Sequence, residues 1–219
     1  MAKGAGMIDP NMATMLCVVT TDASVGAPAL RAMLRDSVED SFNRITIDGD
    51  MSTNDTVILL ANGASRISPE PNLFRQALDT VTRALAHLIV EDGEGVSRFV
   101  EVEVRRAANK ADAKRAAEAI ANSTLVKCAW AGGDPNWGRI LDAVGYSGVK
   151  MQESQADIFY DALPVAVDGV VAKTPVKKLR QIAARKAFRV TVDLKIGQAS
   201  HVVWTTDLTE EYVRLNLGE

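Results

Sequence analysis

The sequence predicts an α/β protein with mixed β-sheets and helices packed outside them. Apolar runs of strand length occur at residues 15–19 and 57–61. Apolar residues at helical spacing run through residues 28–42 and 71–90. Residues 98–106, RFVEVEVRR, alternate between apolar and charged side chains, which is typical of a strand with one solvated face. Strands and helices follow one another without a repeat or a linker, so we expect one α/β unit.

In the first part of the chain, the pattern predicts a strand at 14–23, a helix at 28–42, a short strand at 45–48, a buried strand at 57–61 and a helix at 71–90. Leu30 and Leu34 fall on one face of the first helix, whose first turn contains Pro28. The loop GDMSTNDT, residues 49–56, is too polar to belong to a core. The second helix ends at the acidic, glycine-bearing turn EDGEG, residues 91–95.

The rest of the chain again alternates between strand and helix patterns. The expected elements are a strand at 98–106, a helix at 110–123, a strand at 125–130, a loop at 131–139, strands at 156–162 and 164–169, a helix at 175–186, strands at 188–194 and 200–208, and a helix at 209–216. Glu101 and Glu103 share the outer face of their strand, where we expect both carboxylates to be solvated.

Composition limits the partners and the location. The 219-residue chain is 47% apolar and carries 25 Lys and Arg against 28 Asp and Glu, with a pI near 5.5. It has no basic field of the kind that binds nucleic acid, so we expect no nucleic-acid partner. No apolar stretch reaches the roughly 18 residues of a membrane span, and no secretory signal pattern begins the chain. We therefore expect a cytoplasmic protein that does not enter a membrane.

The cysteines and histidines give no sign of a metal site. Cys17 and Cys128 lie inside apolar, strand-like runs without a CxxC or Cys/His neighbour. We expect two buried free thiols rather than zinc ligands or a disulfide. His87 lies beside apolar residues of a predicted helix and His201 begins a predicted strand, so neither has a metal or triad partner by spacing. We expect structural histidines and no metal.

Thr14 follows the small residue Ala13 where an irregular stretch rich in Gly and Pro gives way to an apolar strand. A threonine hydroxyl becomes a nucleophile when a base activates it, and cleavage of the preceding peptide bond supplies the residue's own α-amine as that base. An α-amine with a pKa of about 7.7 to 8.0 suits proton transfer at neutral pH. The alternative is that Thr14 is only the first residue of a strand, where β-branched residues are common.

Three motifs together resemble one family. KGAGMIDPNMATML (residues 3–16), GDMSTNDT (49–56) and GGDPNWGRI (132–140) follow the order and separations of the ornithine acetyltransferases, the bifunctional glutamate N-acetyltransferases of arginine biosynthesis. The resemblance runs over essentially the whole chain, to EEYVRLN at residues 210–216. It implies the fold of that family, an α/β sandwich with mixed β-sheets between helical layers.

The resemblance also implies a mechanism. The family's precursor cuts itself between the Ala and Thr of its MATML segment, here Ala13 and Thr14, and the new N-terminal Thr accepts an acetyl group. N-acetylornithine donates the acetyl group, ornithine leaves, and glutamate then takes the acetyl group from the enzyme. The scheme needs no metal or nucleotide cofactor, and some members also use acetyl-CoA as a donor.

The resemblance further implies substrate-binding residues. The family's binding lysine, eleven residues before the nucleophile Thr14, matches Lys3; its glutamate in the acidic turn matches Glu94; and its asparagine near the C-terminus matches Asn216. Glu94 would hold the ornithine ammonium and Lys3 a substrate carboxylate. Judged by itself, Glu94 in its glycine-flanked turn could equally have no function. A Thr or Ser about five residues after the asparagine has no counterpart, because the sequence ends at Glu219.

Family precursors carry a further half before this segment, which supplies the donors that stabilise the oxyanion. We therefore expect residues 1–13 to be a stub of an α portion and residues 14–219 to be a nucleophile-bearing β chain that needs a separate α partner, in an assembly of two α and two β chains. The alternatives are a self-cleaving acyltransferase relative with another substrate, and an inactive fragment. In GGDPNWGR, Asp134, Asn136 and Arg139 either shape the substrate site or only the loop.

Overall fold

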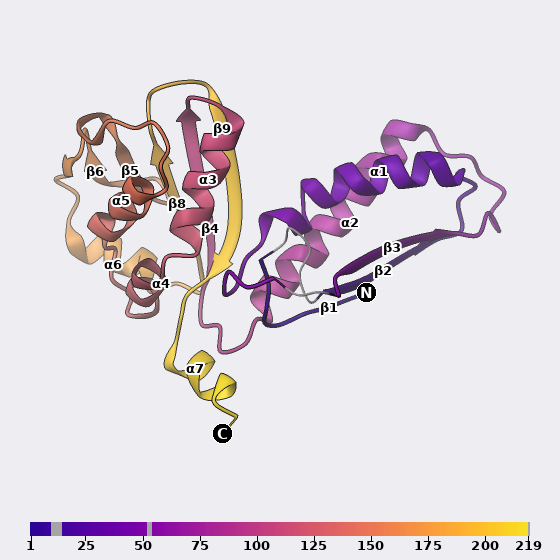
Figure 1. Ribbon diagram of the computed structural model, residues 1–219, viewed down its shortest axis with the longest axis horizontal. Coiled ribbons are helices and arrows are strands. Elements are labelled where there is room, and N and C mark those ends of the chain that lie inside the picture. Colours follow the sequence, from indigo (N-terminus) through magenta and orange to yellow (C-terminus); the bar gives the residue numbers. More distant parts are fainter. Residues whose placement is uncertain (10–14, 52–53, 219) are drawn as a thin grey trace. The chain divides into compact units, whose positions relative to one another are not determined.

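The computed structural model describes residues 1–9, 15–51 and 54–218. They form two compact units, residues 1–93 and residues 94–219, where the sequence favoured one. Each unit has its own β-sheet and its own helices (Figure 1), so the predicted α/β class is confirmed. The division into residues 1–13 and 14–219 describes two chains that self-cleavage would produce. The two compact units do not test it, so it stays a prediction.

The first unit is a three-stranded sheet with two long helices. Its elements are β1 (Ala2–Lys3), β2 (Leu16–Thr21), α1 (Ala27–Glu39), the 3-10 helix η1 (Phe42–Arg44), β3 (Thr56–Ala61) and α2 (Pro71–Glu91). The strand order is β1-β2-β3, with β1 antiparallel to β2 and β2 parallel to β3. Parallel neighbours need a crossover, which α1 and η1 provide.

Local sequence explains where the two long helices of this unit begin and how they meet. Pro28 lies in the first turn of α1. Glu70 begins α2, because its carboxylate accepts the N–H groups of Asn72 and Leu73 at 3.0 and 2.8 Å. The Ser37 and Thr82 hydroxyls, both buried, form a 2.8 Å hydrogen bond between α1 and α2.

The second unit is a six-stranded mixed sheet with helices against one face. Its elements are β4 (Phe99–Ala107), α3 (Lys110–Ala121), α4 (Thr124–Ala131), α5 (Trp137–Tyr146), the 3-10 helix η2 (Glu153–Gln155), β5 (Asp157–Tyr160), β6 (Leu163–Val167), β7 (Val170–Val171), α6 (Val176–Ala183), β8 (Ala187–Asp193), β9 (Ala199–Thr206) and α7 (Glu210–Asn216). The strand order is β7-β6-β5-β8-β4-β9, in which only β4 and β8 are parallel neighbours among the described strands.

The core of the second unit lies between this sheet and its helices. Val100 and Val102 of β4 are fully buried together with the alanine-rich side of α3. Small alanine side chains let a helix pack closely on a sheet. Trp130 of α4 donates its indole N–H to the Tyr160 hydroxyl at 3.2 Å, which satisfies both polar groups inside the core. No helix in the described part of the chain is long and apolar enough to cross a membrane.

The strand predicted at 125–130 is wrong, because these residues belong to α4. Ser123 begins the helix, with its hydroxyl accepting the Val126 N–H at 3.5 Å. Val126 and Trp130, four residues apart, are both buried, as in a helix with one face on the core. A short apolar run fits a strand and a buried helix equally well, so its pattern could not decide between them.

Three other stretches differ from expectation. Residues 45–48 form no strand, and the Ile47 N–H instead donates to the Ile8 carbonyl at 2.6 Å. Lys3, expected to begin an irregular stretch that runs to Met12, instead forms β1 together with Ala2, against β2. Residues 140–155, which no pattern assigned, contain most of α5 and the 3-10 helix η2.

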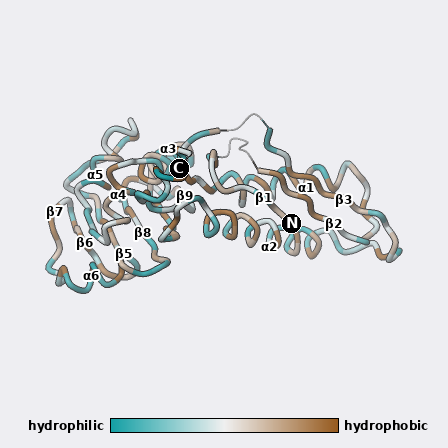
Figure 2. Tube along the Cα trace, turned by 90° about the horizontal axis from the view of Figure 1, so that it is seen from below, coloured by the Kyte–Doolittle hydropathy of each residue, from teal (hydrophilic) through white to brown (hydrophobic). Residues whose placement is uncertain are grey.

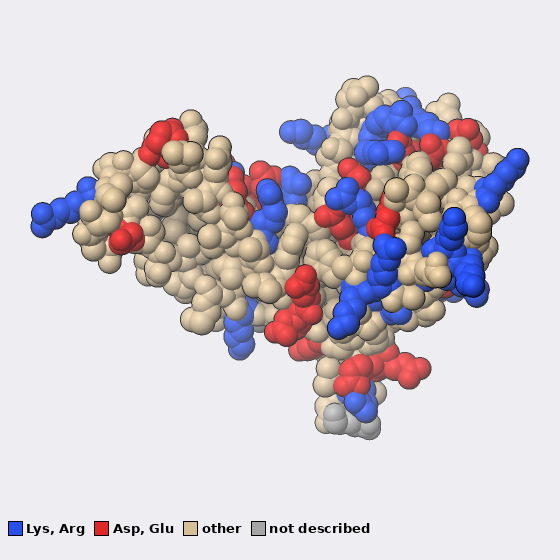
Figure 3. Space-filling model, turned by 180° about the vertical axis from the view of Figure 1, so that it is seen from behind, with Lys and Arg blue, Asp and Glu red and all other residues tan. Residues whose placement is uncertain are grey.

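Glu101 and Glu103, expected to be solvated, are partly buried and paired. Glu101 accepts the Trp204 indole N–H at 2.9 Å, and Glu103 accepts the Thr191 hydroxyl at 3.1 Å. The Arg189 guanidinium forms ion pairs with both carboxylates. Cross-strand neighbours on β8 and β9 therefore supply partners that the alternation of a single strand cannot reveal. Figure 3 shows acidic and basic side chains intermingled over this unit, whereas the visible side of the first unit carries few charges.

Asp193, at the end of β8, is a buried carboxylate between two arginines. It accepts hydrogen bonds from Arg105 at 2.7 Å and from Arg106 at 2.6 Å. Burial raises the pKa of Asp193, but the hydrogen bonds from Arg106 and Arg105 lower it by more, so the pKa lies below its ordinary value of 3.8.

We expect Asp193→Asn to lower the urea midpoint of unfolding at about pH 7. Because the pKa is lower in the folded state, the carboxylate contributes stability above its unfolded pKa and loses it as the pH falls through the folded value. The difference between variant and wild type should therefore shrink below about pH 3.8. Urea unfolding over a pH series checks this, with the exposed Asp142→Asn of α5 as a control that leaves the midpoint unchanged. A difference that is the same in acid and at neutral pH would contradict it.

Candidate active site

The structure describes some of the residues predicted to form the site. Lys3 lies in β1 of the first unit, and Glu94 and Asn216 both lie in the second unit. Ala13 and Thr14, the predicted cleavage site and nucleophile, lie outside the described residues.

Glu94 and Asn216 are 122 residues apart in sequence and in direct contact. The Asn216 side-chain amide donates to Glu94 Oε2 at 3.2 Å and to the Tyr212 carbonyl at 2.9 Å. Asn216 is exposed at the end of α7, and Glu94 is half-buried in the turn before β4. One oxygen of the Glu94 carboxylate is thus held by an amide, which fixes the direction of the group.

A tight contact between the turn and α7 sets up this pair. Thr209 begins α7 by accepting the Tyr212 N–H at 3.2 Å, and its hydroxyl donates to the Gly95 carbonyl at 2.6 Å. Gly95 has a φ of 64°, and a Cβ there would lie 2.3 Å from the Tyr212 nitrogen. Only glycine combines this backbone conformation with so close an approach.

A buried aspartate that the sequence analysis did not single out supports the same turn. Asp207 follows β9, and its carboxylate accepts the N–H groups of Ser97 and Arg98, each at 3.0 Å. The Arg98 guanidinium also pairs with Asp207 at 3.0 Å. The chain around Glu94 is therefore tied to the segment that leads into α7. A lone aspartate after a strand gave no recognisable signal.

Lys3 lies in the first unit, beside an acidic helix end. It pairs with Leu16 across β1 and β2 and its side chain is exposed. A groove of about 550 Å³ is lined by Lys3 and by Leu88, Glu91 and Asp92 of α2. The ammonium group is thus available to an anion, with carboxylates along the same groove.

The chain on either side of the undescribed residues 10–14 is held by two aspartates. Asp48 accepts the N–H groups of Met7 and Ile8 at 2.8 and 3.0 Å. Asp55 accepts the N–H of Met15, the residue after the predicted nucleophile, at 2.6 Å. Asp48 directly precedes the motif GDMSTNDT, and Asp55 lies inside it. This motif contributed to the resemblance to the family, but neither aspartate was given a role.

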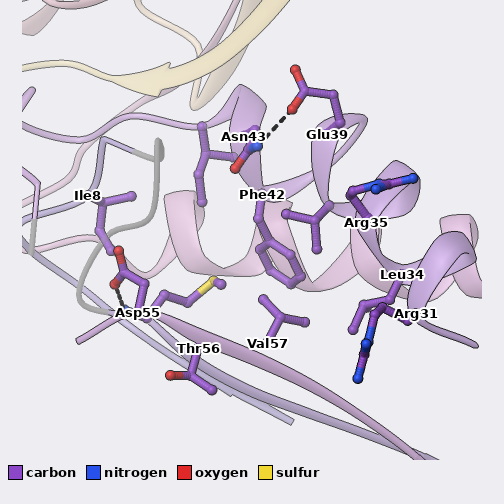
Figure 4. A pocket seen from close by; sticks show the side chains of 13 residues that line it. Ile8, Arg31, Leu34, Arg35, Glu39, Phe42, Asn43, Asp55, Thr56 and Val57 are labelled. Atoms are coloured by element: carbon purple, nitrogen blue, oxygen red, sulfur yellow. Dashed lines mark hydrogen bonds between the residues drawn. The ribbon is translucent and has the colours of Figure 1, made fainter. Parts of the chain in front are cut away.

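Asp55 lies at one end of an apolar cavity, close to Ile8 (Figure 4). The cavity has a volume of about 360 Å³, and Phe42 and Val57 are among the apolar side chains that line it. Burial raises the pKa of Asp55, and the hydrogen bond from Met15 acts in the opposite direction.

The polar side chains of GGDPNWGR serve the loop itself. Asn136 begins α5 by accepting the Arg139 N–H at 3.2 Å and donates to Asp134 at 3.0 Å. The Arg139 guanidinium donates to the Leu125 carbonyl at 2.7 Å, which ties α5 to α4. These contacts favour the architectural interpretation of this motif.

Cys17 is buried as predicted, but the prediction that Cys128 is buried is wrong, because α4 turns this side chain outward. In the described parts of the chain, His, Cys, Asp and Glu form no group of three or more that could hold a metal ion. His87 and His201 are partly buried on α2 and β9.

Known proteins match this chain along nearly all of its length. A relative from Geobacter sulfurreducens named "Arginine biosynthesis bifunctional protein ArgJ" is 49% identical over 98% of this chain and 56% of its own length. A Methanocaldococcus jannaschii protein named "Glutamate N-acetyltransferase" is 45% identical over 98% of this chain and 56% of its own length. The chain thus spans about half the length of the curated relatives it matches.

A solved structure agrees with these relatives. The crystal structure of an arginine biosynthesis bifunctional protein ArgJ chain from Bacillus halodurans aligns with 94% of this chain and all of its own, with a TM-score of 0.89 and 37% identity. The ArgJ family model matches residues 1–218. By its sequence and its fold, this chain belongs to the ArgJ family.

Proposed function

We propose that this chain is the nucleophile-bearing part of an acetyltransferase of arginine biosynthesis, which moves an acetyl group from N-acetylornithine to glutamate. The observation that carries the proposal is the match of 98% of the chain to relatives whose names state arginine biosynthesis and glutamate N-acetylation. We further propose that the enzyme works in the cytoplasm, without a metal or nucleotide cofactor, and that acetyl-CoA can serve as a second acetyl donor.

In this proposal, Thr14 performs both chemical steps. Its hydroxyl attacks the Ala13 carbonyl, and hydrolysis of the resulting ester frees the Thr14 α-amine. The hydroxyl then attacks the acetyl carbonyl of N-acetylornithine, the α-amine takes the hydroxyl proton, and the same proton passes to the amine of the departing ornithine. The amine of glutamate attacks the acetyl-threonine and restores the hydroxyl.

Glu94, Asn216 and Lys3 are the proposed substrate contacts. The Glu94 carboxylate would hold the ammonium group of ornithine, and the hydrogen bond from Asn216 supports this role because it fixes the carboxylate and leaves one oxygen for the substrate. Lys3, exposed on its groove, would bind a substrate carboxylate.

An α portion is the proposed partner, in an assembly of two α and two β chains. Apolar side chains of β2 and β3 alternate onto one face of the first sheet, where Leu16, Val18, Ile58 and Leu60 are 38 to 54% exposed. Figure 2 shows both strands as strongly apolar. Exposed apolar patches mark interaction surfaces. The relatives are nearly twice as long as the matched region, so the part of them outside it is the occupant that we propose for this face.

Thr14→Ala should abolish both cleavage and acetyl transfer, because the attacking oxygen is lost. The measurement combines intact mass with turnover of N-acetylornithine, using the chain co-expressed with the part of the Geobacter relative outside the match. Thr80→Ala, at an exposed position of α2, is the matched control and should leave both unchanged. Transfer that survives Thr14→Ala would contradict covalent catalysis by this residue.

The wild-type chain in the same experiment separates the alternative functions. A chain that is cut but not acetylated would indicate another substrate, and one that stays uncut and inert would indicate an inactive fragment.

Glu94→Gln should raise the KM for N-acetylornithine by about tenfold with a smaller change in kcat, because an amide replaces the charge that binds the ammonium group. Steady-state kinetics at saturating glutamate measure this. Glu153→Gln, on the exposed 3-10 helix η2, is the control. An unchanged KM would overturn the role of Glu94.

Gly95→Ala should also raise this KM, because the added Cβ would force the Tyr212 backbone away and separate Asn216 from Glu94. Gly145→Ala on α5, where a Cβ meets nothing within 4 Å, is the matched control. Equal KM values for Gly95→Ala and wild type would show that this geometry does not matter for binding.

A further inference from the structure

Asp207, between β9 and α7, is a buried carboxylate that holds the chain just after Glu94. Its Oδ1 accepts the N–H groups of Ser97 and Arg98, each at 3.0 Å. Its Oδ2 accepts the Ser97 hydroxyl and the Arg98 guanidinium, the latter at 3.0 Å. The Asp207 side chain has no exposed surface, and charge-assisted hydrogen bonds are strong in such surroundings. Two consecutive residues between Glu94 and β4 are thus fixed by both backbone and side chain.

The Arg98 guanidinium also joins Asp207 to the ends of two helices. Its Nε donates to the carbonyl of Ala183, the last residue of α6, at 2.9 Å. Its Nη1 donates to the carbonyl of Ala131, the last residue of α4, at 3.0 Å. The last carbonyls of a helix lack partners within the helix, and a cation is favourable there. The pair is therefore anchored to the helices of this unit, unlike an ion pair on the surface.

Lys127 of α4 fixes the chain on both sides of Asp207. Its side chain is buried, and its ammonium group donates to the Thr205 hydroxyl at 3.0 Å and to the Thr206 carbonyl at 2.5 Å. Its backbone carbonyl accepts the Leu208 N–H at 3.3 Å. A shift of Asp207 would therefore break contacts to α4.

We propose that Asp207, held by Arg98 and Lys127, is a positioning residue for substrate recognition. It sets the place of Glu94 relative to α7. This inference rests on the function proposed above, in which Glu94 binds the side-chain ammonium group of the acetyl donor. One of the segments that Asp207 joins leads back to Glu94, and the other leads through α7 to Asn216, whose amide holds the Glu94 carboxylate. A binding group is held accurately only when the residues behind it are fixed as well.

The two substrates give a readout that a general loss of structure would not. N-acetylornithine ends in an ammonium group, whereas the side chain of glutamate ends in a carboxylate, so the proposed contact with Glu94 serves the donor alone. With an acetyl-enzyme between two half-reactions, kcat/KM for the donor reports the first half and kcat/KM for glutamate reports the second. A displaced Glu94 should lower the first value and leave the second unchanged, whereas a damaged fold should lower both.

Asp207→Asn in the assembled enzyme is the test. The asparagine carbonyl can still accept the two backbone N–H groups, but its NH₂ group meets the Ser97 hydroxyl and the Arg98 guanidinium, which loses its counter-charge. We expect kcat/KM for N-acetylornithine to fall on the order of tenfold and kcat/KM for glutamate to stay the same. Ser97→Ala removes a hydrogen bond without leaving a charge unpaired, so it should cause a smaller loss that is again specific to the donor.

Asp193→Asn is the matched control. Asp193 is also buried and accepts hydrogen bonds from Arg105 and Arg106. These arginines lie near the end of β4, whereas Arg98 directly precedes its start. The replacement breaks an equivalent buried pair and costs stability without touching the segments that Asp207 joins. Both kcat/KM values, measured per mole of folded enzyme, should equal those of wild type.

A donor-specific loss in Asp207→Asn that is absent from Asp193→Asn supports the proposal. An unchanged value for the donor, an equal loss for both substrates, or the same donor-specific loss in Asp193→Asn overturns it. If Asp207→Asn gives no folded enzyme, Ser97→Ala decides by the same criteria.

Glu94→Gln, measured alongside, separates this inference from the proposed function. If Glu94→Gln shows a donor-specific loss and Asp207→Asn shows none, only the positioning role fails. If Glu94→Gln shows no such loss, the binding role of Glu94 is wrong, and the positioning role falls with it.

Discussion

Two aspartates hold the chain on either side of residues 10–14. Ile8 pairs with Asp48 and Met15 with Asp55, and in both pairs the partners are 40 residues apart. The parallel strands β2 and β3 continue the same offset, from Leu16 and Thr56 onward. The chain up to Ile8 and the strand that follows Met15 are therefore both held by the segment that contains Asp48, Asp55 and β3. A one-residue slip would turn each β2 side chain to the opposite face of the sheet.

In the second unit, contacts from α7 and its flanking residues hold the Glu94 carboxylate in a fixed direction. Glu94 sits in a short turn, and turns alone do not orient side chains. The turn is clamped instead by Gly95 against Tyr212, by Thr209, and by the buried Asp207. These contacts hold the start of α7 against the turn, and at the end of the helix Asn216 reaches Glu94.

The sequence predicted those elements whose patterns are long. The helix at 71–90 and the alternating strand at 98–106 agree with α2 and β4 because each pattern extends over many residues. LVKCAW was misassigned because a short apolar run contains no full period that separates strand from helix. The partners of Glu101 come from β8 and β9, and no local pattern contains them.

Residues of the site that lie in motifs could be predicted from the sequence, whereas the contacts between them could not. The motifs pointed to Lys3, Glu94 and Asn216, and the contact between the last two follows from a fold that brings distant segments together. Asp55 stood inside a quoted motif, but its hydrogen bond to Met15 could not be foreseen, because it joins residues 40 positions apart in the sequence.

The most direct measurement is peptide mapping of the working enzyme after it is quenched during turnover of N-acetylornithine. The account predicts a peptide that begins at Thr14 and carries one acetyl group on its side-chain oxygen. An active preparation in which residues 13 and 14 remain joined, or in which the acetyl group is found on another residue, would contradict it.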